Sequence, residues 1–561
     1  MLFTGAQILI EELVRNNVDV VFGYPGGAIL DIYDELYKNE KRIRHVISAH
    51  EQGASHAADG YARVTGKTGV VIATSGPGAT NLVTGIANAH LDSVPLVVIT
   101  GNVATGLLGK DSFQEVDIVG ITLPVVKHNH IVQDVKDLAH ELASAFNIAS
   151  QGRKGPVLID IPKDVQRAKC EYIPCEFEQS DNRTNGVSFS GNLIEAIDAI
   201  NNCERPYIYC GGGIIWSNAG DEILALSQKI SAPVGLSMMG LTAIPGSYQL
   251  NLGMCGMHGK YAASVAQSKS DLMIAAGVRF SDRATGNIAE YTKNCRVIHI
   301  DIDQAELGKN VPNIIELYGD AKQILSSLVQ KIEEKHNSEW IGTIVSDLEV
   351  GNIEEDSKLC LCGNKKFTPG NIIRTLREYI SDDTIIATDV GQHQMWVMQN
   401  YRFEKPRTLL TSSGLGAMGF GLGAAIGGCI ACGRKRTVLF TGDGSFGMNL
   451  NELATAVSQE LPIIIVLMNN GVLGMVRQWQ GMFYQERYSS TTLGRKTDFP
   501  ALAKAFGADG AAVTSIAQLR NILDSPIPED KPFVIDCHID MDEKVFPMIP
   551  PGGSVRDIRI G

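Results

Sequence analysis

The 561-residue sequence predicts an α/β protein of three consecutive domains, each built on a doubly wound parallel sheet. In every third of the chain, short β-rich apolar runs alternate with stretches that carry apolar residues at helical spacing. This alternation is typical of parallel sheets covered by helices on both faces. The chain is also too long for one hydrophobic core. Two polar stretches, residues 170–186 and 346–366, divide it into domains of residues 1–170, 187–345 and 367–561.

Buried parallel strands are expected where an apolar run contains no charged residue. Such runs lie at residues 69–73 and 95–99 in the first domain, 207–209 and 272–275 in the second, and 384–387 and 463–467 in the third. Helical stretches separate them, and one of these is the alanine-rich segment 50–63. We therefore expect the same alternation of strand, helix and strand in all three domains.

Composition and charge exclude several classes of function. A net charge of −13 and a pI near 5.5 argue against nucleic-acid binding. No apolar run approaches the ~20 residues that a membrane helix needs, and residues 1–6 lack the charged region and cleavage site of a secretion signal. Eleven cysteines, an odd number, indicate reduced thiols. We therefore expect a cytoplasmic protein that binds neither nucleic acid nor membrane.

Two motifs in the third domain predict a ligand site at the edge of a sheet. Asp443 lies in a Gly-Asp-Gly-Ser turn after the apolar run 438–441, and Asn470 ends the run 463–468. The stretch between them has helical spacing, and we expect its helix to begin after Gly447. This order places Asp443 and Asn470 at the carboxyl ends of neighbouring parallel strands, where open α/β sheets bind ligands.

The pair suits a hard divalent cation. A carboxylate and an amide oxygen are ligands that Mg²⁺ prefers, and phosphates and water usually supply the rest. We expect the backbone carbonyl of Val472 to be a third protein ligand. Gly442 and Gly444 allow backbone N–H groups to approach phosphates. An ordinary Asp-Gly turn is the alternative for either motif alone, but the joint spacing favours the metal site.

Gly-Asp-Gly, a helix and then Asn-Asn resembles the fingerprint of the thiamine diphosphate (ThDP) enzymes, in which the Asp and the second Asn hold Mg²⁺ against the cofactor's diphosphate. Three α/β domains match that family's order of a pyrimidine-binding, a central and a diphosphate-binding domain. Further stretches make the chain similar to the catalytic subunits of the acetohydroxyacid synthases (acetolactate synthases). They are residues 110–115, 160–164, 277–283, 414–421 and 474–480.

The resemblance gives Glu51 the role of activating the cofactor. Glu51 lies in His-Glu-Gln-Gly-Ala near the start of a helix and matches the family's glutamate that hydrogen-bonds N1′ of the aminopyrimidine. That bond favours the imino tautomer, whose 4′-nitrogen removes the C2 proton of the thiazolium. The carboxyl must be largely removed from water for this task. A glutamate stabilised by the helix dipole in a first turn is the alternative.

The same resemblance implies a larger set of cofactor and substrate residues. Met418 is expected beneath ThDP, where it holds the cofactor bent, and Met475 is expected to cover it; a Met that only fills the core is the alternative. The implied ThDP set is Gly27, Glu51, Gln392, His393, Gly416, Met418, Gly442, Asp443, Gly444, Ser445, Asn470, Gly474 and Met475, with Asp443, Asn470 and Val472 on the metal.

Substrate binding is implied for a second group. Trp479 is expected to shape the pocket for the second ketoacid, and Arg283 to bind its carboxylate, for which guanidinium geometry is well suited. A surface ion pair with Asp282 is the alternative for Arg283. The family's signature has an Asp where this chain has Ser281. Phe113, Gln114 and Lys163 are expected to face the substrate channel, with Gln114 and Lys163 as catalytic residues beside Glu51.

The implied reaction is the decarboxylation of pyruvate and transfer of the remaining hydroxyethyl group to a second 2-ketoacid, pyruvate or 2-ketobutyrate, in the biosynthesis of valine and isoleucine. A pyruvate oxidase that uses ThDP and FAD is the alternative. In the family, the pyrimidine-binding domain of one subunit faces the diphosphate-binding domain of another. We therefore expect a homodimer or homotetramer with sites at the subunit interface. The binding of a small regulatory subunit is left open.

FAD is implied in the central domain, in a structural role, because the net reaction moves no electrons. An acidic residue after a strand can bind ribose hydroxyls, and Asp301 follows the apolar run 297–300. No Gly-x-Gly-x-x-Gly motif opens the domain, and residues 211–213 are only a weak substitute. The implied FAD set is Arg153, Gly212, Met257, His258, Gly259, Arg279, Asp301, Asp303 and Asp320.

Overall fold

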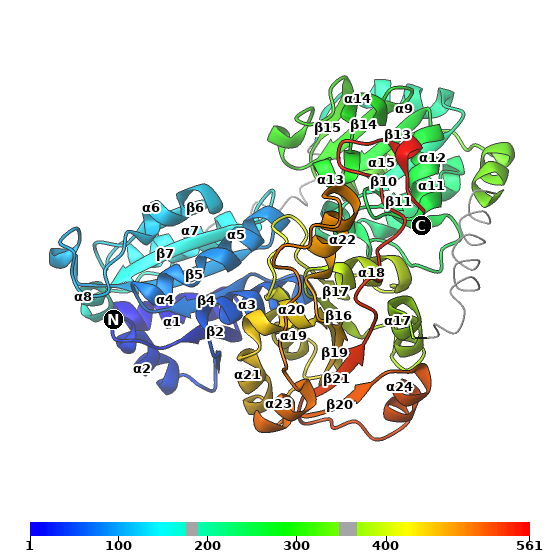
Figure 1. Cartoon of the computed structure of the whole chain (residues 1–561). Coiled ribbons are helices and arrows are strands. Elements are labelled where there is room, and N and C mark those ends of the chain that lie inside the picture. Colours follow the sequence, from blue (N-terminus) through cyan, green and yellow to red (C-terminus); the bar gives the residue numbers. More distant parts are fainter. Residues whose placement is uncertain (176–188, 347–366, 561) are drawn as a thin grey trace.

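The computed structural model describes residues 1–175, 189–346 and 367–560, and each of these stretches folds around one large sheet (Figure 1). The sheets have six, seven and six strands, and helices cover both faces of each. The predicted α/β class with three successive sheets is therefore confirmed. We call the three parts the N domain, the central domain and the C domain.

The N domain has a parallel sheet with the strand order β3-β2-β4-β5-β7-β6. Its strands are β2 (Val20–Tyr24), β3 (Arg44–Ile47), β4 (Gly69–Ala73), β5 (Leu96–Asn102), β6 (His128–Ile131) and β7 (Pro156–Pro162). Its helices are α1 (Gly5–Arg15), α2 (Leu30–Lys38), α3 (Glu51–Thr65), α4 (Pro77–Thr80), α5 (Val83–Asp92), α6 (Ile118–Thr122), α7 (Leu138–Ser150) and α8 (Lys163–Arg167). One face of the sheet packs against α1 and α7, the other against α3 and α5.

The predicted start of the first linker, at residue 170, is too early. Strand β8 (Lys169–Glu171) pairs antiparallel with β1 (Leu2–Thr4), Cys170 is buried in the N-domain core, and Tyr172 stacks on Phe3. These contacts hold the segment on the domain, so its polar composition was misleading. Residues 176–186 of that linker, and residues 347–366 of the second one, lie outside the described residues. The domain boundaries therefore stay predictions.

The central domain has the strand order β12-β11-β10-β13-β14-β15-β9. The last strand departs from the predicted parallel sheet, because the two-residue β9 pairs antiparallel with Leu317 and Tyr318 at one edge. Antiparallel edge strands are common on otherwise parallel sheets. The strands are β9 (Ser190–Gly191), β10 (Pro206–Cys210), β11 (Val234–Leu236), β12 (Asn251–Met254), β13 (Leu272–Ala276), β14 (Arg296–Asp301) and β15 (Ile314–Tyr318). The helices are α9 (Leu193–Asn202), α10 (Gly212–Trp216), α11 (Gly220–Ile230), α12 (Tyr261–Lys269), α13 (Asp282–Thr285), α14 (Ile288–Tyr291) and α15 (Ala321–Lys331).

The C domain has the order β17-β16-β18-β19-β21-β20, with every recorded pair parallel. Its strands are β16 (Ile385–Thr388), β17 (Leu409–Leu410), β18 (Thr437–Gly442), β19 (Ile463–Asn469), β20 (Asp509–Val513) and β21 (Phe533–His538). Its helices are α17 (Pro369–Arg377), α18 (Gln392–Asn400), α19 (Phe420–Ala431), α20 (Asp443–Asn449), α21 (Glu452–Ser458), α22 (Gly474–Phe483), α23 (Phe499–Ala505) and α24 (Ile516–Leu523). The last residues of the chain leave β21 and run to the central domain (Figure 1).

The N and C domains share a hydrophobic core along α3 and α19. The two backbones approach so closely that only glycine fits at several positions. A Cβ on Gly427 would lie 1.8 Å from the carbonyl oxygen of Ala57, and one on Gly60 would lie 2.3 Å from that of Ala424. The small residues therefore set the spacing between the two domains.

Glu452 of the C domain fixes the start of α3. Its carboxylate accepts hydrogen bonds from the backbone N–H groups of Ala49 at 3.2 Å and His50 at 2.9 Å. Free N–H groups before a helix are favourable positions for a carboxylate. The C domain thus holds the residue that precedes Glu51 in place.

Within the described residues, no helix has the length and hydrophobicity that crossing a membrane requires. The described cysteines are all free thiols.

Replacing Gly427 by alanine tests the contact between α3 and α19. Overpacking of a tight core typically costs about 1–3 kcal/mol, so we expect the apparent melting temperature to fall by roughly 2–10 °C. The matched control is Gly342→Ala, at an exposed position with no other atom within 4 Å of the new Cβ. Equal melting temperatures for the two variants in differential scanning calorimetry would show that the helices do not pack this closely.

Candidate active site

Asp443 lies at the carboxyl edge of the C-domain sheet. Strands β18 and β19 pair in parallel up to Gly442 and Met468, and Asp443 directly follows β18. The predicted helix start after Gly447 is wrong, because α20 begins at Asp443 with Gly442 as its N-cap residue. The carboxylate therefore lies in the positive first turn of a helix. Burial raises the pKa of Asp443 to about 6, against the opposing effect of hydrogen bonds from three backbone N–H groups.

One of those three N–H groups belongs to Asn470, so the two predicted metal ligands are neighbours. The side-chain oxygen of Asn470 accepts a bond from the Val472 N–H at 3.2 Å, and its Nδ2 faces Gln392 Oε1 at 3.4 Å. Val472 is buried and forms a bridge with Thr492. Asp443 and Asn470 thus lie at one corner of the sheet, and their side chains carry the carboxylate and amide oxygens expected of Mg²⁺ ligands.

Tight backbone positions and an unpartnered ring nitrogen surround this corner. His393 lies against Gly442, where an added Cβ would stand 3.0 Å from Nδ1. Burial lowers the pKa of His393 to about 3, so the ring is neutral, and its buried Nε2 has no hydrogen-bond partner among the described residues. A Cβ on Gly474 would collide with Gln392 Oε1 at 2.0 Å. An open polar atom beside glycine backbone fits a phosphate-bearing ligand.

A cavity of about 1350 Å³ opens beside the corner, between the three domains. Gly416, Met418 and Met475 line it from the C domain. A Cβ on Gly444, next to Asp443, would stand 3.9 Å from the Met418 methyl carbon, so the metal corner and the cavity adjoin. Ser445 is buried beneath, where its hydroxyl accepts a bond from the Gly442 N–H at 3.2 Å. The volume exceeds that of an ordinary small-molecule pocket.

Arg283 and Trp479 meet at the wall of this cavity. The Arg283 guanidinium carbon stands 5.5 Å from the centre of the Trp479 ring, a cation–π geometry. The alternative ion pair with Asp282 is long, at 3.8 Å, and exposed. Trp479 Nε1 is buried without a partner among the described residues. The cation therefore faces the cavity as well as solvent, as a carboxylate-binding group requires.

Most of the residues implied for FAD line another part of the same cavity. They are Arg153, Gly212, Met257, His258, Arg279, Asp301 and Asp320. Arg279 forms no recorded hydrogen bond or ion pair with its guanidinium among the described residues, whereas Arg153 is paired with Asp303 at 3.2 Å and Glu306 at 2.7 Å. Burial raises the pKa of Asp301 to about 6. Gly259 does not line the cavity, because it packs on the backbone of Cys255, and Asp303 serves as the partner of Arg153.

Glu51 is the first residue of α3 and is buried. Its carboxylate accepts a hydrogen bond from Asn81 Nδ2 at 2.9 Å, and a Cβ on Gly78 would approach it at 3.3 Å. Gly78 belongs to the short helix α4, and Asn81 directly follows that helix. The side chain is therefore held at the carboxyl edge of the N-domain sheet, as expected of its position after β3.

The other N-domain candidates gather at the same edge. Lys163 donates from Nζ to the carbonyl oxygen of Gly27 at 3.0 Å, and Gln114 lies against Gly76. Phe113 is 88% exposed. None of these residues, nor Glu51, is among the residues that line the described cavity. Within one chain, the structure thus brings the predicted site residues together in two groups rather than one.

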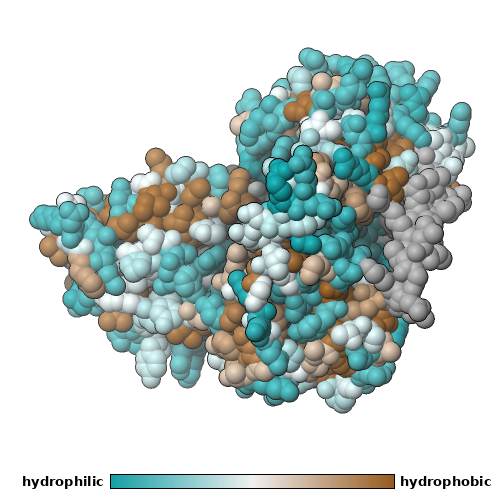
Figure 2. Space-filling view, viewed as in Figure 1, coloured by the Kyte–Doolittle hydropathy of each residue, from teal (hydrophilic) through white to brown (hydrophobic). Residues whose placement is uncertain are grey.

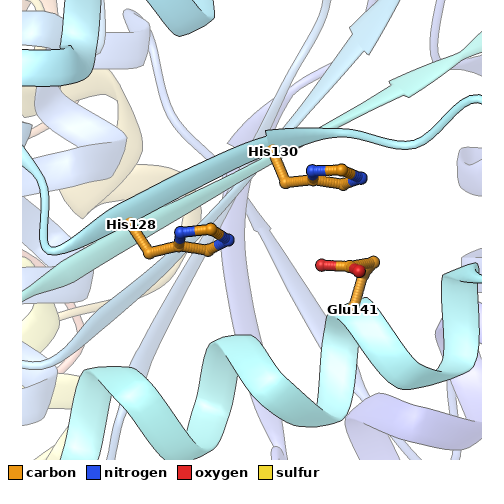
Figure 3. A group of neighbouring side chains, drawn as sticks. All are labelled: His128, His130 and Glu141. Carbon is orange, nitrogen blue, oxygen red and sulfur yellow. The ribbon is translucent and has the colours of Figure 1, made fainter.

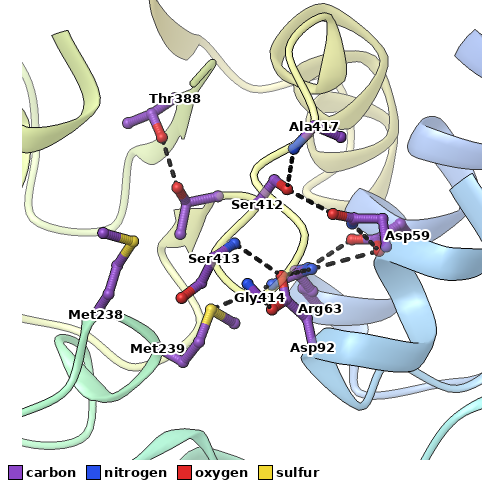
Figure 4. A network of polar contacts seen from close by, with 12 residues as sticks. Asp59, Arg63, Asp92, Met238, Met239, Thr388, Ser412, Ser413, Gly414 and Ala417 are labelled. Carbon is purple, nitrogen blue, oxygen red and sulfur yellow. Dashed lines mark hydrogen bonds and ion pairs between the residues drawn. The ribbon is translucent and has the colours of Figure 1, made fainter. Parts of the chain in front are cut away.

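A buried charge network, which the sequence did not reveal, holds the loop of residues 412–418 against the N domain (Figure 4). Arg63 of α3 pairs with Asp59 and, at 3.0 Å, with Asp92, and all three are buried. Asp92 accepts the backbone N–H groups of Ser413 at 3.1 Å and Gly414 at 2.8 Å. The loop carries Gly416 and Met418, so the network positions two cavity-lining residues.

Two further hydrogen bonds extend this network. The Ser412 hydroxyl donates to Asn88 Oδ1 at 2.6 Å. The same hydroxyl accepts the Ala417 N–H at 2.8 Å (Figure 4). At the other end of the loop, Asp389 accepts the N–H groups of Gly419 and Gly421. Burial raises the pKa of Asp389 to about 6. One signal was available in the sequence, since Asp59 and Arg63 are four residues apart in the predicted helix 50–63.

Replacing Asp92 by asparagine tests this network. The change leaves Arg63 with one carboxylate partner and replaces a charged acceptor of the loop by an amide, which we expect to cost about 3 kcal/mol, as breaking buried pairs does. The apparent melting temperature should fall, and proteolysis within residues 411–418 should accelerate. Asp34→Asn, which removes an exposed partner of Lys38, is the control and should change neither. A loop of unchanged protease resistance in Asp92→Asn would contradict the role.

Comparisons with known proteins agree with the geometry. Three family models match in order: the thiamine pyrophosphate enzyme N-terminal domain at residues 3–121, the central domain at 193–328 and the C-terminal domain at 389–537. The acetolactate synthase large subunit of Corynebacterium glutamicum is 44% identical over 99% of this chain and 90% of its own length. The large subunit of Mycobacterium tuberculosis is 43% identical, over 99% and 91%. A probable large subunit of Methanocaldococcus jannaschii is 40% identical, over 99% and 95%.

The matched domains span the corner with Asp443 and Asn470, the cavity beside it and the edge that carries Glu51. The chain belongs to the thiamine pyrophosphate enzymes and, among them, to the family of the acetolactate synthase large subunits.

Proposed function

We propose that this chain is a ThDP-dependent acetolactate synthase, which decarboxylates pyruvate and joins the remaining two-carbon unit to a second 2-ketoacid. One observation carries the proposal: the Asp443–Asn470 corner adjoins a cavity whose walls include Met418, Arg283 and Trp479. Full-length similarity to proteins named acetolactate synthase supports this reaction over that of a pyruvate oxidase.

The C-domain corner fits Mg²⁺ and a diphosphate. Asp443 and Asn470 would supply oxygen ligands to Mg²⁺, and we propose the backbone carbonyl of Val472 as the third protein ligand. The first turn of α20, at Gly442, Gly444 and Ser445, offers backbone N–H groups for phosphate oxygens. His393 Nε2 and Gln392 lie beside them and are further candidates for that contact. When bound there, ThDP supplies the electron sink for decarboxylation.

Arg283 and Trp479 are our candidates for binding the second ketoacid. The guanidinium carries a charge suited to a carboxylate, and the indole face beside it keeps that charge partly out of water. The C-terminal segment borders the same region, because the N–H of Ile549 donates to Met257 and the carbonyl of Gly553 accepts from Asn287. These groups exclude water from the reacting carbon, so that the two-carbon unit is transferred rather than protonated.

Glu51 requires a second subunit in this proposal. It is not among the residues that line the cavity of its own chain. Apolar side chains gather on the N domain around α5 and α6 (Figure 2), where Phe113, Ile121 and Leu123 are exposed. Exposed apolar surface of this kind is typical of interfaces. A partner's C domain packed against this surface would bring the partner's metal corner to Glu51. The resulting assembly is a homodimer or a multiple of one.

The remainder of the cavity suits FAD in a structural role. Arg279 is a cation without a protein partner among the described residues, as a diphosphate needs, and Asp301 is an acid at a strand end, as a ribose needs. Lys163 and Gln114 are proposed catalytic residues beside Glu51. The relatives' names also support a small regulatory subunit as partner.

Product analysis tests the reaction. Purified protein with pyruvate, ThDP and Mg²⁺ should form 2-acetolactate, whereas acetate or peroxide as the main product would establish an oxidase. Asp443→Ala should abolish the activity, because a hard cation loses its only charged protein ligand. Retained cofactor binding by Asp443→Ala in calorimetry would refute the metal corner, even if activity were lost.

Mixing two inactive variants tests the shared site. Glu51→Gln and Asp443→Ala should each be inactive alone. Coexpression should restore about a quarter of wild-type activity, because about half of randomly formed dimers are mixed and each of these carries one intact site. Activity that stays at zero in the mixture, with dimers present by sedimentation, would show that both residues act within one chain.

A further inference from the structure

A second group of candidate metal-binding side chains lies apart from the Asp443 corner, on β6 and α7 of the N domain. His128 and His130 of β6 and Glu141 of α7 point toward one another (Figure 3). One ligand atom from each lies within 4.8 Å of the others. His128 is exposed, and the other two are partly exposed.

The backbone explains why these three side chains converge. Side chains alternate between the faces of a strand, so His128 and His130 share one face of β6. Asn129 points to the opposite face, where it donates to the Val119 carbonyl oxygen at 2.6 Å and to Thr122. The two imidazole rings are nearly parallel, with 6.4 Å between their centres and 9° between their planes.

Helix α7 brings the carboxylate to the same face. Leu138, Leu142 and Ala145 bury the inner side of α7 in the N-domain core, which fixes the rotation of the helix about its axis. Glu141 is thereby turned toward the histidines of the neighbouring edge strand (Figure 3). The geometry thus rests on packed elements rather than on a loop.

The donor set selects a particular class of ion. Two imidazole nitrogens and one carboxylate oxygen suit zinc and the neighbouring first-row transition metals, whereas Mg²⁺ prefers oxygen ligands alone. Bonds to zinc of about 2.0–2.2 Å place ligand atoms about 3.4 Å apart in a tetrahedron. The ligand atoms therefore need to approach one another by up to about 1.4 Å, which the exposure of these side chains to solvent allows.

We propose that His128, His130 and Glu141 form a binding site for one divalent transition-metal ion of the zinc class, with water completing the coordination. The ion ties the edge strand β6 to α7 and so stabilises the outer edge of the N domain. This site is separate from the Asp443 corner, whose proposed metal ligands are oxygen atoms, and its existence does not depend on the reaction catalysed.

Cobalt absorbance tests the proposal on the full-length chain without a histidine tag. Excess Mg²⁺ and ThDP occupy the oxygen-ligand site, and Co²⁺ is then titrated. We expect one equivalent to give visible bands that Zn²⁺ abolishes. His130→Ala and Glu141→Gln should weaken binding by about tenfold or more, since even loss of an outer-shell partner typically costs about tenfold. Zn²⁺ should raise the melting temperature of the wild-type protein but not of His130→Ala.

His140→Ala is the matched control, because it removes the adjacent histidine of α7 and leaves the three proposed ligands intact. It should bind Co²⁺ as the wild-type protein does. Equal binding by wild-type protein and His130→Ala would overturn the site, as would loss of binding in His140→Ala, which would assign the metal to His140 and the Cys175 thiol 3.5 Å from it. Melting curves without added metal verify that each variant is folded.

Discussion

The backbones of helices α3 and α19 are in direct contact, and this contact fixes the relative positions of the two groups of predicted site residues. At one end of α3, Glu452 of the C domain accepts the N–H groups of the residues just before Glu51. Farther along α3, Arg63 and its two carboxylates reach the loop that carries Met418. Because protein interiors transmit small displacements, a shift of one helix would move both cofactor-binding edges together.

Buried carboxylates do much of the positioning around the cavity. Asp389 and Asp443 have raised pKa values because burial disfavours the ionised form, and both accept several backbone N–H groups. Asp389 uses these bonds to shape the glycine-rich loop 414–421. Asp443 retains capacity for a cation, which would offset its burial. The same chemical group thus has a structural role at one strand end and a proposed ligand role at the next.

The two groups of site residues also account for the exposed apolar surface of the N domain. A catalytic glutamate must be dry to share a proton with a ring nitrogen, yet the edge that carries Glu51 is not covered by the cavity of its own chain. Glu51 is already buried within its own chain, and in the proposed dimer a partner subunit would cover the exposed Phe113 as well. In this proposal, assembly and catalysis depend on the same surface.

The α/β class, the strand at residues 463–467 and the placement of Asp443 beside Asn470 were predictable from sequence, because buried parallel strands carry no charge and their ends converge on one edge. Predictions from the local sequence pattern were wrong where tertiary contacts determine the structure. The polar segment at Cys170 is held by pairing with β1, and α20 begins at Asp443 because Gly442 caps it. The roles assigned to the site residues stay predictions.

The sequence by itself determined the cofactor class and the two motif-bearing edges, since both rest on residues close together in the chain. Only the tertiary structure revealed that Asp92 holds Gly414, that Arg283 stacks on Trp479, and that His128 faces Glu141. These pairs join separate elements, and in two of them the partners lie more than a hundred residues apart. No local periodicity encodes such contacts, because they depend on how whole sheets and helices pack.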